Sequence, residues 1–250
     1  MVATLGYRRN GQKFAEINTA LFSGRVKFGS KRNGFHSAGL QALSDKEGFV
    51  LRRNRVAATY ARHQRVSEKY YLAAGLSAGF YNFSIRANDV TGGVSSYVLD
   101  GALSVKLYGQ RTEVGIGVSQ ANQPSLTPIG SEIVLERNLN VLARQHVELN
   151  SDFTLIPAGY ARYSSNRDNI YTGLLLGFGT NLLMRQHIVA GANWQMRNGM
   201  YASVGVRNIE IGGSRLGGEV AYYLPNRNVF ATNVQRFELF LTYHLEATNN

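Results

Sequence analysis

The stretch YVLDGALSVKLYGQRTEVGIGVSQ, residues 97–120, decides the fold class, because it places charges in an otherwise apolar run that has no helical period. Residues at alternate positions of a β-strand point to opposite faces. One face is then apolar and the other small or charged: the first carries Leu99, Leu103, Val105 and Leu107, and the second carries Asp100, Ala102, Ser104 and Lys106. The alternation resumes after residues 109–111 with Val114, Ile116 and Val118, which indicates a hairpin.

Two kinds of β protein fit this alternation. A soluble β-sandwich buries its apolar face and hydrates the polar one. A membrane barrel does the reverse, with apolar residues toward lipid and polar residues toward the lumen. The pattern of one hairpin leaves both possibilities open.

Similar alternating segments recur from one end of the chain to the other. Their length is close to the roughly 9 to 11 residues that a tilted strand needs to cross a bilayer. We expect about fourteen strands, give or take two, at residues 2–8, 18–28, 35–43, 55–64, 71–85, 97–108, 112–120, 145–155, 160–165, 169–180, 183–196, 200–211, 215–224 and 235–245.

The expected connections alternate between long and short. The first, third, fifth, seventh and thirteenth are long, the even-numbered ones are short, and the ninth and eleventh are short exceptions. This arrangement places the long loops at one end, as in outer-membrane barrels. The expected fold is therefore all-β: one antiparallel transmembrane β-barrel of about fourteen strands with long loops at one end, occupying residues 1–250 as a single domain.

Composition excludes several other classes of protein. The chain has no Cys, so it forms no disulfide and has no thiolate metal site. No apolar run approaches the roughly 20 residues of a spanning helix. The first residues show no export signal, so the outer-membrane localisation that we expect requires a signal peptide that is not present in this sequence. The net charge of +11 comes from scattered basic residues, which argues against nucleic acid as a partner.

Charged residues share the face that a barrel would turn inward. We expect them to line the lumen, where they can pair or stay hydrated. The polar lumen residues expected on this basis are Asp100, Lys106, Glu148, Asp152, Arg207, Glu219 and Glu238. Four aromatic residues of the same parity, Tyr81, Phe83, Tyr223 and Phe240, are expected to fill part of the lumen.

Several segments resemble the PorP/SprF family of type IX secretion outer-membrane proteins. The resemblance is carried by the turn DKEG at 45–48, by Tyr60-Ala61, by LSAG at 76–79, by RQH at 144–146, by LIPAGYARY at 155–163 and by FELFLTYHL at 237–245. It implies an integral barrel that serves the export or surface anchoring of a large adhesin. The implied partners are the C-terminal domain of that secreted adhesin, a periplasmic peptidoglycan-linked protein and outer-membrane lipid.

The sequence offers no catalytic, cofactor-binding or metal-binding motif. The five His residues lack HxH or HExxH spacing, and the glycine-rich runs match neither GxGxxG nor a P-loop. We therefore expect no enzyme activity and no cofactor. Two alternatives stay open: a passive outer-membrane pore or hydrophobic-solute transporter, and a soluble ligand-binding β protein.

The seventh connection, about residues 121–144, is too long for a turn. Unstructured loops of that length in a compact domain are usually functional or disordered. Its alternating segment EIVLERNL predicts a partner-binding surface made of Glu132, Ile133, Leu135, Glu136 and Arg137. The alternative is that the loop folds back to plug its own barrel.

Overall fold

The computed structural model describes residues 1–11, 17–29, 33–48, 50–86, 93–127, 132–164, 173–196, 199–224 and 235–245. These residues form strands joined by turns, and none of them belongs to a helix that could cross a membrane. The strands are β1 (Val2–Gly11), β2 (Ile17–Phe28), β3 (Gly34–Glu47), β4 (Leu51–Arg65), β5 (Tyr70–Ile85), β6 (Val94–Gly109), β7 (Thr112–Ser119), β8 (Ser125–Leu126), β9 (Ile133–Val134), β10 (Asn138–Gln145), β11 (Val147–Glu148), β12 (Phe153–Ser164), β13 (Leu174–Met184), β14 (Ile188–Gln195), β15 (Gly199–Ile211), β16 (Ser214–Tyr223) and β17 (Gln235–Leu245).

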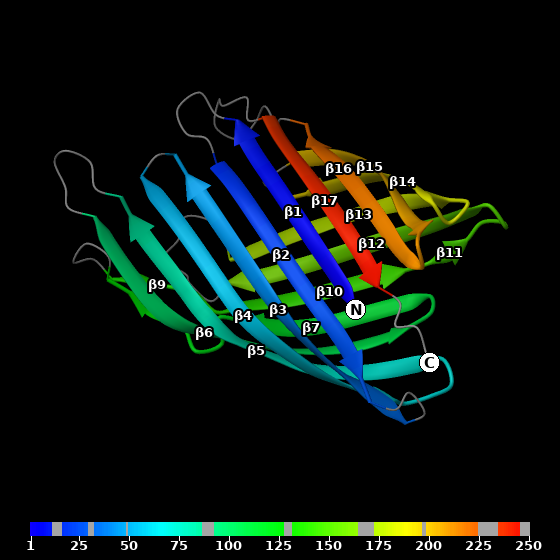
Figure 1. Ribbon diagram of the computed structural model, residues 1–250, viewed down its shortest axis with the longest axis horizontal. Helices are drawn as coiled ribbons and strands as arrows, with labels where there is room; N and C mark the ends of the chain where they lie inside the picture. The colour runs from blue at the N-terminus through cyan, green and yellow to red at the C-terminus, as the bar shows by residue number, and fades with distance from the viewer. Residues whose placement is uncertain are drawn as a thin grey trace.

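Fourteen antiparallel strands close into a barrel, as the alternating pattern predicts (Figure 1). Consecutive strands of the barrel pair with one another, and β1 pairs with β17 to close it. β10 follows β7 in the barrel and pairs with both β7 and β12. The short β11 adds to the end of β12, and β8 and β9 form a separate hairpin. The strand ends that the longer connections join lie at one end of the barrel, and Met1 and Leu245 lie toward the opposite end, which has the tight turns (Figure 1).

The strand expected over residues 145–155 is wrong. The eighth barrel strand is β10, and the chain then turns, because the side-chain Oδ1 of Asn150 accepts hydrogen bonds from the N–H groups of Asp152 and Phe153. Pro157, expected in a turn, lies inside β12 opposite the interruption between β10 and β11, where no neighbouring strand requires its missing N–H.

Two expected connections also differ from the structure. The third is short rather than long, because β3 continues to Glu47 and β4 already begins at Leu51. The turn expected at residues 181–182 lies within β13. The chain turns instead at Arg185 and Gln186, which adopt positive φ angles of 47° and 62°.

The outward face of the barrel is apolar. Leu103 is 59% exposed although it is a large aliphatic residue in the middle of a strand, and its outward neighbours on β6 and β7 are exposed as well. Farther around the wall, Trp194 of β14 packs on Phe178 of β13, with 5.0 Å between ring centroids. Exposed large hydrophobic residues of this kind include Leu5, Val56, Leu76, Phe80, Leu99, Val105, Ile116, Val204 and Leu241. The apolar face of the opening hairpin is thus the face that a membrane would cover.

A row of polar side chains forms the boundary of this apolar outer face at the loop end of the barrel. Ser44 donates to Asn54 at 2.8 Å, Asn54 donates to Asn82 at 3.3 Å, and Asn82 donates to Ser95 at 2.7 Å, so the row crosses four strands. On β4 the next outward charge is Arg62. The segment between Asn54 and Arg62 spans about 20 Å along the barrel axis at a rise of roughly 3.3 Å and a tilt near 40°, comparable with the apolar band of about 25 Å in outer-membrane barrels.

The barrel wall has two heights. The strands β3 to β6 contain 14 to 16 residues each, whereas β7 and β10 contain 8 each. Ala102 of β6 pairs with Ser119 at the end of β7, Ser119 pairs with Asn138, and Asn138 pairs with Ser164 at the end of β12. The wall formed by β7, β10 and β12 therefore stops at the level of Ala102, and β6 continues beyond it.

Candidate functional site

Two ion pairs lie on the inner wall near the loop end of the barrel. Asp100 is only 3% exposed, and its Oδ2 lies 2.6 Å from Nε of Arg55 on β4. Glu238 of β17 is similarly buried, and its Oε1 lies 2.6 Å from Nε of Arg8 on β1. Arg8 and Glu238 are directly opposite each other on adjacent strands, and Arg55 reaches Asp100 past the intervening β5, so cations on the same wall neutralise the charges that interrupt the apolar pattern.

Two further clusters pair charges nearer the turn end. Glu113 accepts a hydrogen bond from Lys106 at 3.0 Å and forms a second, short ion pair with Arg144. Arg207 lies 3.2 Å from Glu219 on the adjacent strand. Five of the seven residues expected in the lumen therefore face the interior: Asp100, Lys106, Arg207, Glu219 and Glu238.

The remaining two expected lumen residues lie elsewhere. Glu148 is on the two-residue β11 and pairs at 2.6 Å with Arg111 of the neighbouring turn, and both side chains are largely exposed. Asp152 belongs to the exposed turn that Asn150 organises. Both residues are at the turn end because the strand expected to carry them does not form. His146 lies between them and β10, and its pKa is lowered by burial and by the charges of Arg144 and Arg207.

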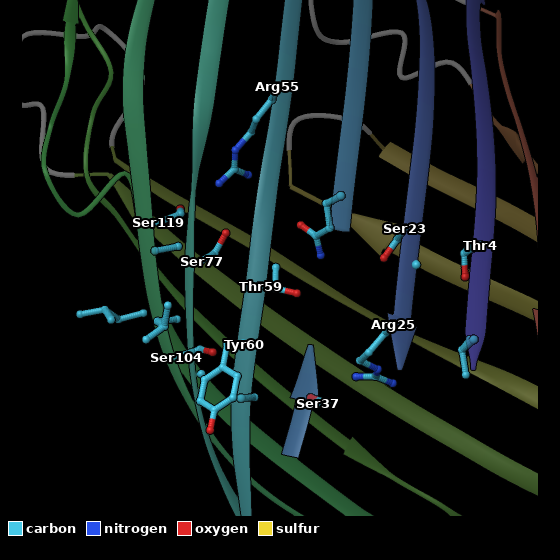
Figure 2. A pocket seen from close by; sticks show the side chains of 18 residues that line it. Thr4, Ser23, Arg25, Ser37, Arg55, Thr59, Tyr60, Ser77, Ser104 and Ser119 are labelled. Carbon is cyan, nitrogen blue, oxygen red and sulfur yellow. The ribbon is translucent and has the colours of Figure 1, made fainter. Parts of the chain in front are cut away.

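Small hydroxyl side chains line the middle of the lumen. A cavity of about 490 Å³ opens between them, and Figure 2 shows Arg25 and Arg55 extending toward the same space. The hydroxyl residues come from the seven neighbouring strands β1 to β7: Thr4, Ser23, Ser37, Thr59, Ser77, Ser104 and Ser119. A second cavity of about 620 Å³ continues past His63 and Lys106 toward the apolar side chain of Leu142. The lumen beside β1 to β7 is thus polar and lined mainly by small side chains.

Aromatic rings lie flat against glycines of the inner wall. The ring of Phe240 covers Gly6, its partner across β1 and β17, where an added Cβ would lie 2.9 Å from the ring. The ring of Tyr160 covers Gly177 in the same manner between β12 and β13. Tyr223 and Phe83 are buried as well, so all four aromatic positions expected in the lumen, Tyr81 among them, carry the inward parity.

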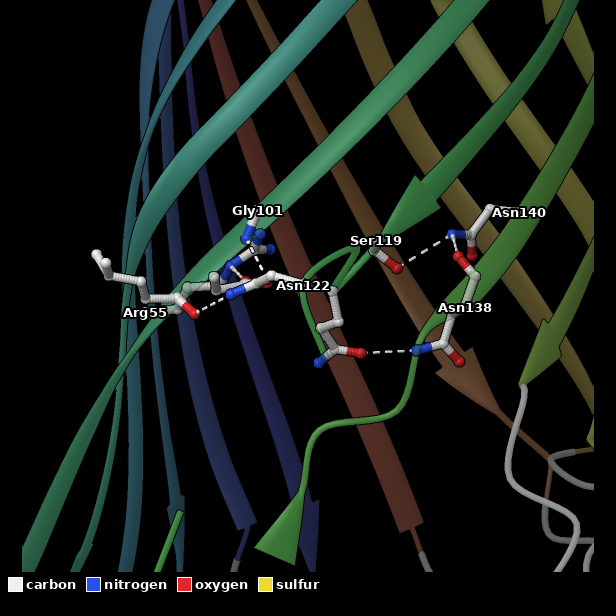
Figure 3. Close-up of polar contacts among 9 residues, drawn as sticks. Arg55, Gly101, Ser119, Asn122, Asn138 and Asn140 are labelled. Carbon is white, nitrogen blue, oxygen red and sulfur yellow. Dashed lines mark hydrogen bonds and ion pairs between the residues drawn. The ribbon is translucent and has the colours of Figure 1, made fainter. Parts of the chain in front are cut away.

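The loop between β7 and β10 is held on its own barrel by side-chain amides (Figure 3). Asn122 accepts from the N–H of Gly101 at 3.1 Å and donates to the carbonyl of Leu99 at 2.8 Å. Asn138 donates to Gln120 at 2.7 Å, and Asn140 donates to Ser119 at 3.2 Å. The sequence pattern did not predict this clip, the set of side-chain amide contacts made by Asn122, Asn138 and Asn140. The available signal was the run SQANQ directly after β7, which is rich in side-chain amides.

The predicted partner-binding residues divide into two groups. Glu136 forms a short hydrogen bond with Ser164 of β12 and so attaches the loop to the barrel. Arg137 donates to the carbonyl of Ala121 at 2.8 Å and so joins the two ends of the loop. Glu132 and Ile133 are exposed, whereas Leu135 is half-buried. Ile133 belongs to the β8–β9 hairpin, whose Leu126 is only 1% exposed. The hairpin thus folds partly onto its own barrel and leaves one outer side free.

The described residues contain no group of three or more His, Cys, Asp or Glu side chains that could hold a metal ion. The polar groups that converge in the interior are hydroxyls and neutralised ion pairs, arranged around cavities on the lumen side of the wall. What this arrangement offers chemically is a hydrated, charge-balanced interior together with a structured loop at its rim.

Known proteins match this chain at the level of family and fold. A family model described as "Type IX secretion system membrane protein PorP/SprF" matches residues 2–243. No curated protein matches. The structure resembles the Pseudomonas putida toluene transporter TodX (TM-score 0.63, 8% identity, covering 100% of this chain and 89% of that one). It also resembles a Pseudomonas aeruginosa FadL homologue (0.56, 7%, 98% and 90%) and the translocator domain of the autotransporter NalP from Neisseria meningitidis (0.54, 10%, 98% and 88%). At these identities the likeness shows the fold alone, an outer-membrane β-barrel.

Proposed function

The chain belongs to the PorP/SprF family of type IX secretion system membrane proteins, and we propose that it is a non-enzymatic outer-membrane barrel that supports the export or surface anchoring of a large adhesin. The partner is the C-terminal domain of that secreted protein, and a periplasmic peptidoglycan-linked protein is a further partner. The observation that carries the proposal is the family match over residues 2–243, almost the whole chain.

The interior supports a role in docking rather than in solute flow. Inward aromatic rings and paired charges narrow the lumen on several sides, and the two cavities of about 490 and 620 Å³ are local spaces along the wall. The choice between docking and solute transport rests on the family and not on the fold. Solved structures of the same fold include proteins described as a toluene transporter and a monoaromatic hydrocarbon channel.

The alternative function is a passive outer-membrane pore or a hydrophobic-solute transporter. Single-channel recording in planar bilayers distinguishes it from the proposed function. We expect small or no steps of conductance, because inward aromatic rings and paired charges narrow the lumen. Large, stable steps would favour the pore.

The loop between β7 and β10 allows a sharp test of partner binding. The N–H of Leu135 donates to the carbonyl of Pro124 at 2.8 Å, so the two ends of the intervening segment are already adjacent. Residues 125–134 can therefore be replaced by Asn-Gly without stretching the chain, and the Asn122 and Arg137 contacts stay in place.

We expect this hairpin deletion to leave a heat-modifiable barrel in the outer membrane and to abolish co-purification of the secreted partner. The matched control replaces Glu136 and Arg137 by Ala, which loosens the loop but keeps the exposed side of the hairpin. If the partner co-purifies with the deletion variant at unchanged yield, the hairpin is not the binding surface.

A further inference from the structure

The loop-end half of β6 has a sheet edge without a neighbouring strand among the described residues. β5 pairs with β6 along the whole of Val94–Gly109, but β7 pairs with it only between Ala102 and Tyr108. In an antiparallel ladder each residue directs its N–H and C=O to the same side, and successive residues alternate sides. Because Gly101 and Leu99 bond on the side away from β5, the backbone groups of Tyr97 and Ser95 point to that side too.

Asn122 occupies the first step of this edge as a strand would. Its amide bonds both the N–H of Gly101 and the carbonyl of Leu99, and the N–H of Ala121 donates to the carbonyl of Gly101 at 2.9 Å (Figure 3). Beyond this clip, the N–H of Leu99 and both backbone groups of Tyr97 and Ser95 have no backbone partner in the part of the chain that the structure describes. The nearby β8 pairs with β9, not with β6.

β8 lies close to β6, but the edge's own sequence lacks the residues that usually protect free strands. Proteins cover exposed edges with Lys, Pro, bulges or inward-pointing charges. Residues 94–99, VSSYVL, contain none of them. Tyr97 is 70% exposed and Leu99 63% exposed, and both side chains flank the edge on the outward face, where they can contact alternate side chains of an added strand.

The height of the edge makes it accessible from water. Tyr97 lies twelve residues from Gly109 at the end of β6, which corresponds to about 30 Å above the turn end at a rise of roughly 3.3 Å and a tilt near 40°. The apolar band of such barrels is about 25 Å tall. The free edge therefore emerges at the loop end just beyond the band, and Ser95 already belongs to the polar row that ends the apolar face.

We propose that the free edge of β6, residues 95–99, binds an extended strand of the secreted partner by β-strand addition above the end of β7. The inference rests on the proposed function, which supplies the partner. The backbone groups of the edge require an occupant that offers alternating donors and acceptors, which an extended peptide does.

A second copy of this chain does not fit the edge. Antiparallel pairing of two β6 edges requires the two strands to run in opposite directions, whereas two barrels in one membrane have the same orientation. An axis along the membrane normal, the symmetry of a dimer in one membrane, makes the two tilted strands cross instead of lying parallel. The geometry thus favours a partner that approaches from outside the membrane.

The test measures binding of a probe domain to the complete barrel in detergent. The probe is the C-terminal domain of the secreted protein that disappears from the cell surface when the gene for this barrel is deleted. Tyr97→Pro removes an N–H that points away from β5, so the barrel keeps all its ladder hydrogen bonds. We expect binding at least about tenfold weaker, the equivalent of one lost hydrogen bond and a steric block. Tyr97→Phe keeps both the N–H and the outward ring, so its affinity for the domain should stay within about threefold of that of the original chain. Ser95→Pro repeats the test should Tyr97→Pro insert poorly.

Hydrogen exchange reads the same edge directly. We expect the amides of Tyr97 and Leu99 to exchange more slowly when the domain is bound. If the domain binds Tyr97→Pro and Ser95→Pro as tightly as the original chain, and both amides exchange at the same rate with and without the domain, the β6 edge is not its site. The proposed function then stands without this inference. Slowed exchange that depends only on barrel concentration would show that a second copy covers the edge and would overturn the inference. A domain that does not bind the barrel at all overturns the inference and the proposed function together.

Discussion

Replacing Leu103 by Arg should reveal whether the exposed apolar face of the barrel contacts lipid. Leu103 lies six residues from Gly109, which places it about 15 Å above the turn end, close to the middle of a band about 25 Å tall. An Arg at the midplane of a lipid-facing strand costs roughly 2 to 4 kcal/mol, and the cost falls to about 0 to 1 kcal/mol near the interfaces. We therefore expect Leu103→Arg to destabilise the barrel by about 3 kcal/mol.

Two matched variants isolate the cause of this loss. Ser104→Arg adds the same charge at the next position of the strand, where the side chain faces the central cavity, so it should cost less than about 1 kcal/mol. Asn54→Arg adds it on the outward face but in the polar row, where the cost should be equally small.

Urea unfolding of the barrel from phospholipid vesicles measures these differences. The chain has a single Trp, and Trp194 lies on the outward face against Phe178, so its fluorescence reports exposure of the lipid-facing surface. At a urea dependence of roughly 2 kcal/mol per molar, the expected loss for Leu103→Arg moves the midpoint down by about 1.5 M. A midpoint shift for Leu103→Arg no larger than that for Ser104→Arg would refute the assignment of Leu103 to the lipid face.

Two further predictions concern the interior. Asp100→Ala leaves the Arg55 guanidinium without its carboxylate and should lower the free energy of unfolding by about 3 kcal/mol in the same assay. Adding Arg55→Met should restore most of this loss, because it removes the unpaired charge. A double variant no more stable than Asp100→Ala would argue against this pairing. Gly177→Ala should lower the free energy of unfolding by roughly 1 to 3 kcal/mol, because the new methyl group collides with the ring of Tyr160. Gly159→Ala, whose Cβ meets its nearest atom at 3.7 Å, should be close to neutral. Equal losses of stability would contradict the packing of the Tyr160 ring.

The sequence predicts the barrel because the period-two pattern survives in most strands. Leu99, Leu103 and Asp100 show both faces within one segment, and their outward and inward positions follow from the alternation alone. The number of strands follows from the same pattern, and the family follows from turn and strand signals such as DKEG at 45–48.

The pattern fails where local hydrogen bonding competes with it. Residues 145–155 alternate as well as any strand, yet Asn150 turns the chain, and Pro157 is tolerated in β12 because the facing strand is interrupted there. For this reason Glu148 and Asp152 lie at the turn end and not in the lumen. The clip of Asn122 on β6 joins residues more than twenty positions apart, and no periodicity in the sequence signals which backbone group an exposed amide will bond.

The central claim is that this barrel serves export or surface anchoring of a secreted protein. The most direct test compares the amount of each protein on the cell surface and in the periplasm between cells with and without the barrel. We expect one large protein to disappear from the surface and accumulate in the periplasm, and to return when the intact chain is supplied. Unchanged surface protein, together with a loss of uptake of small solutes, would contradict the claim.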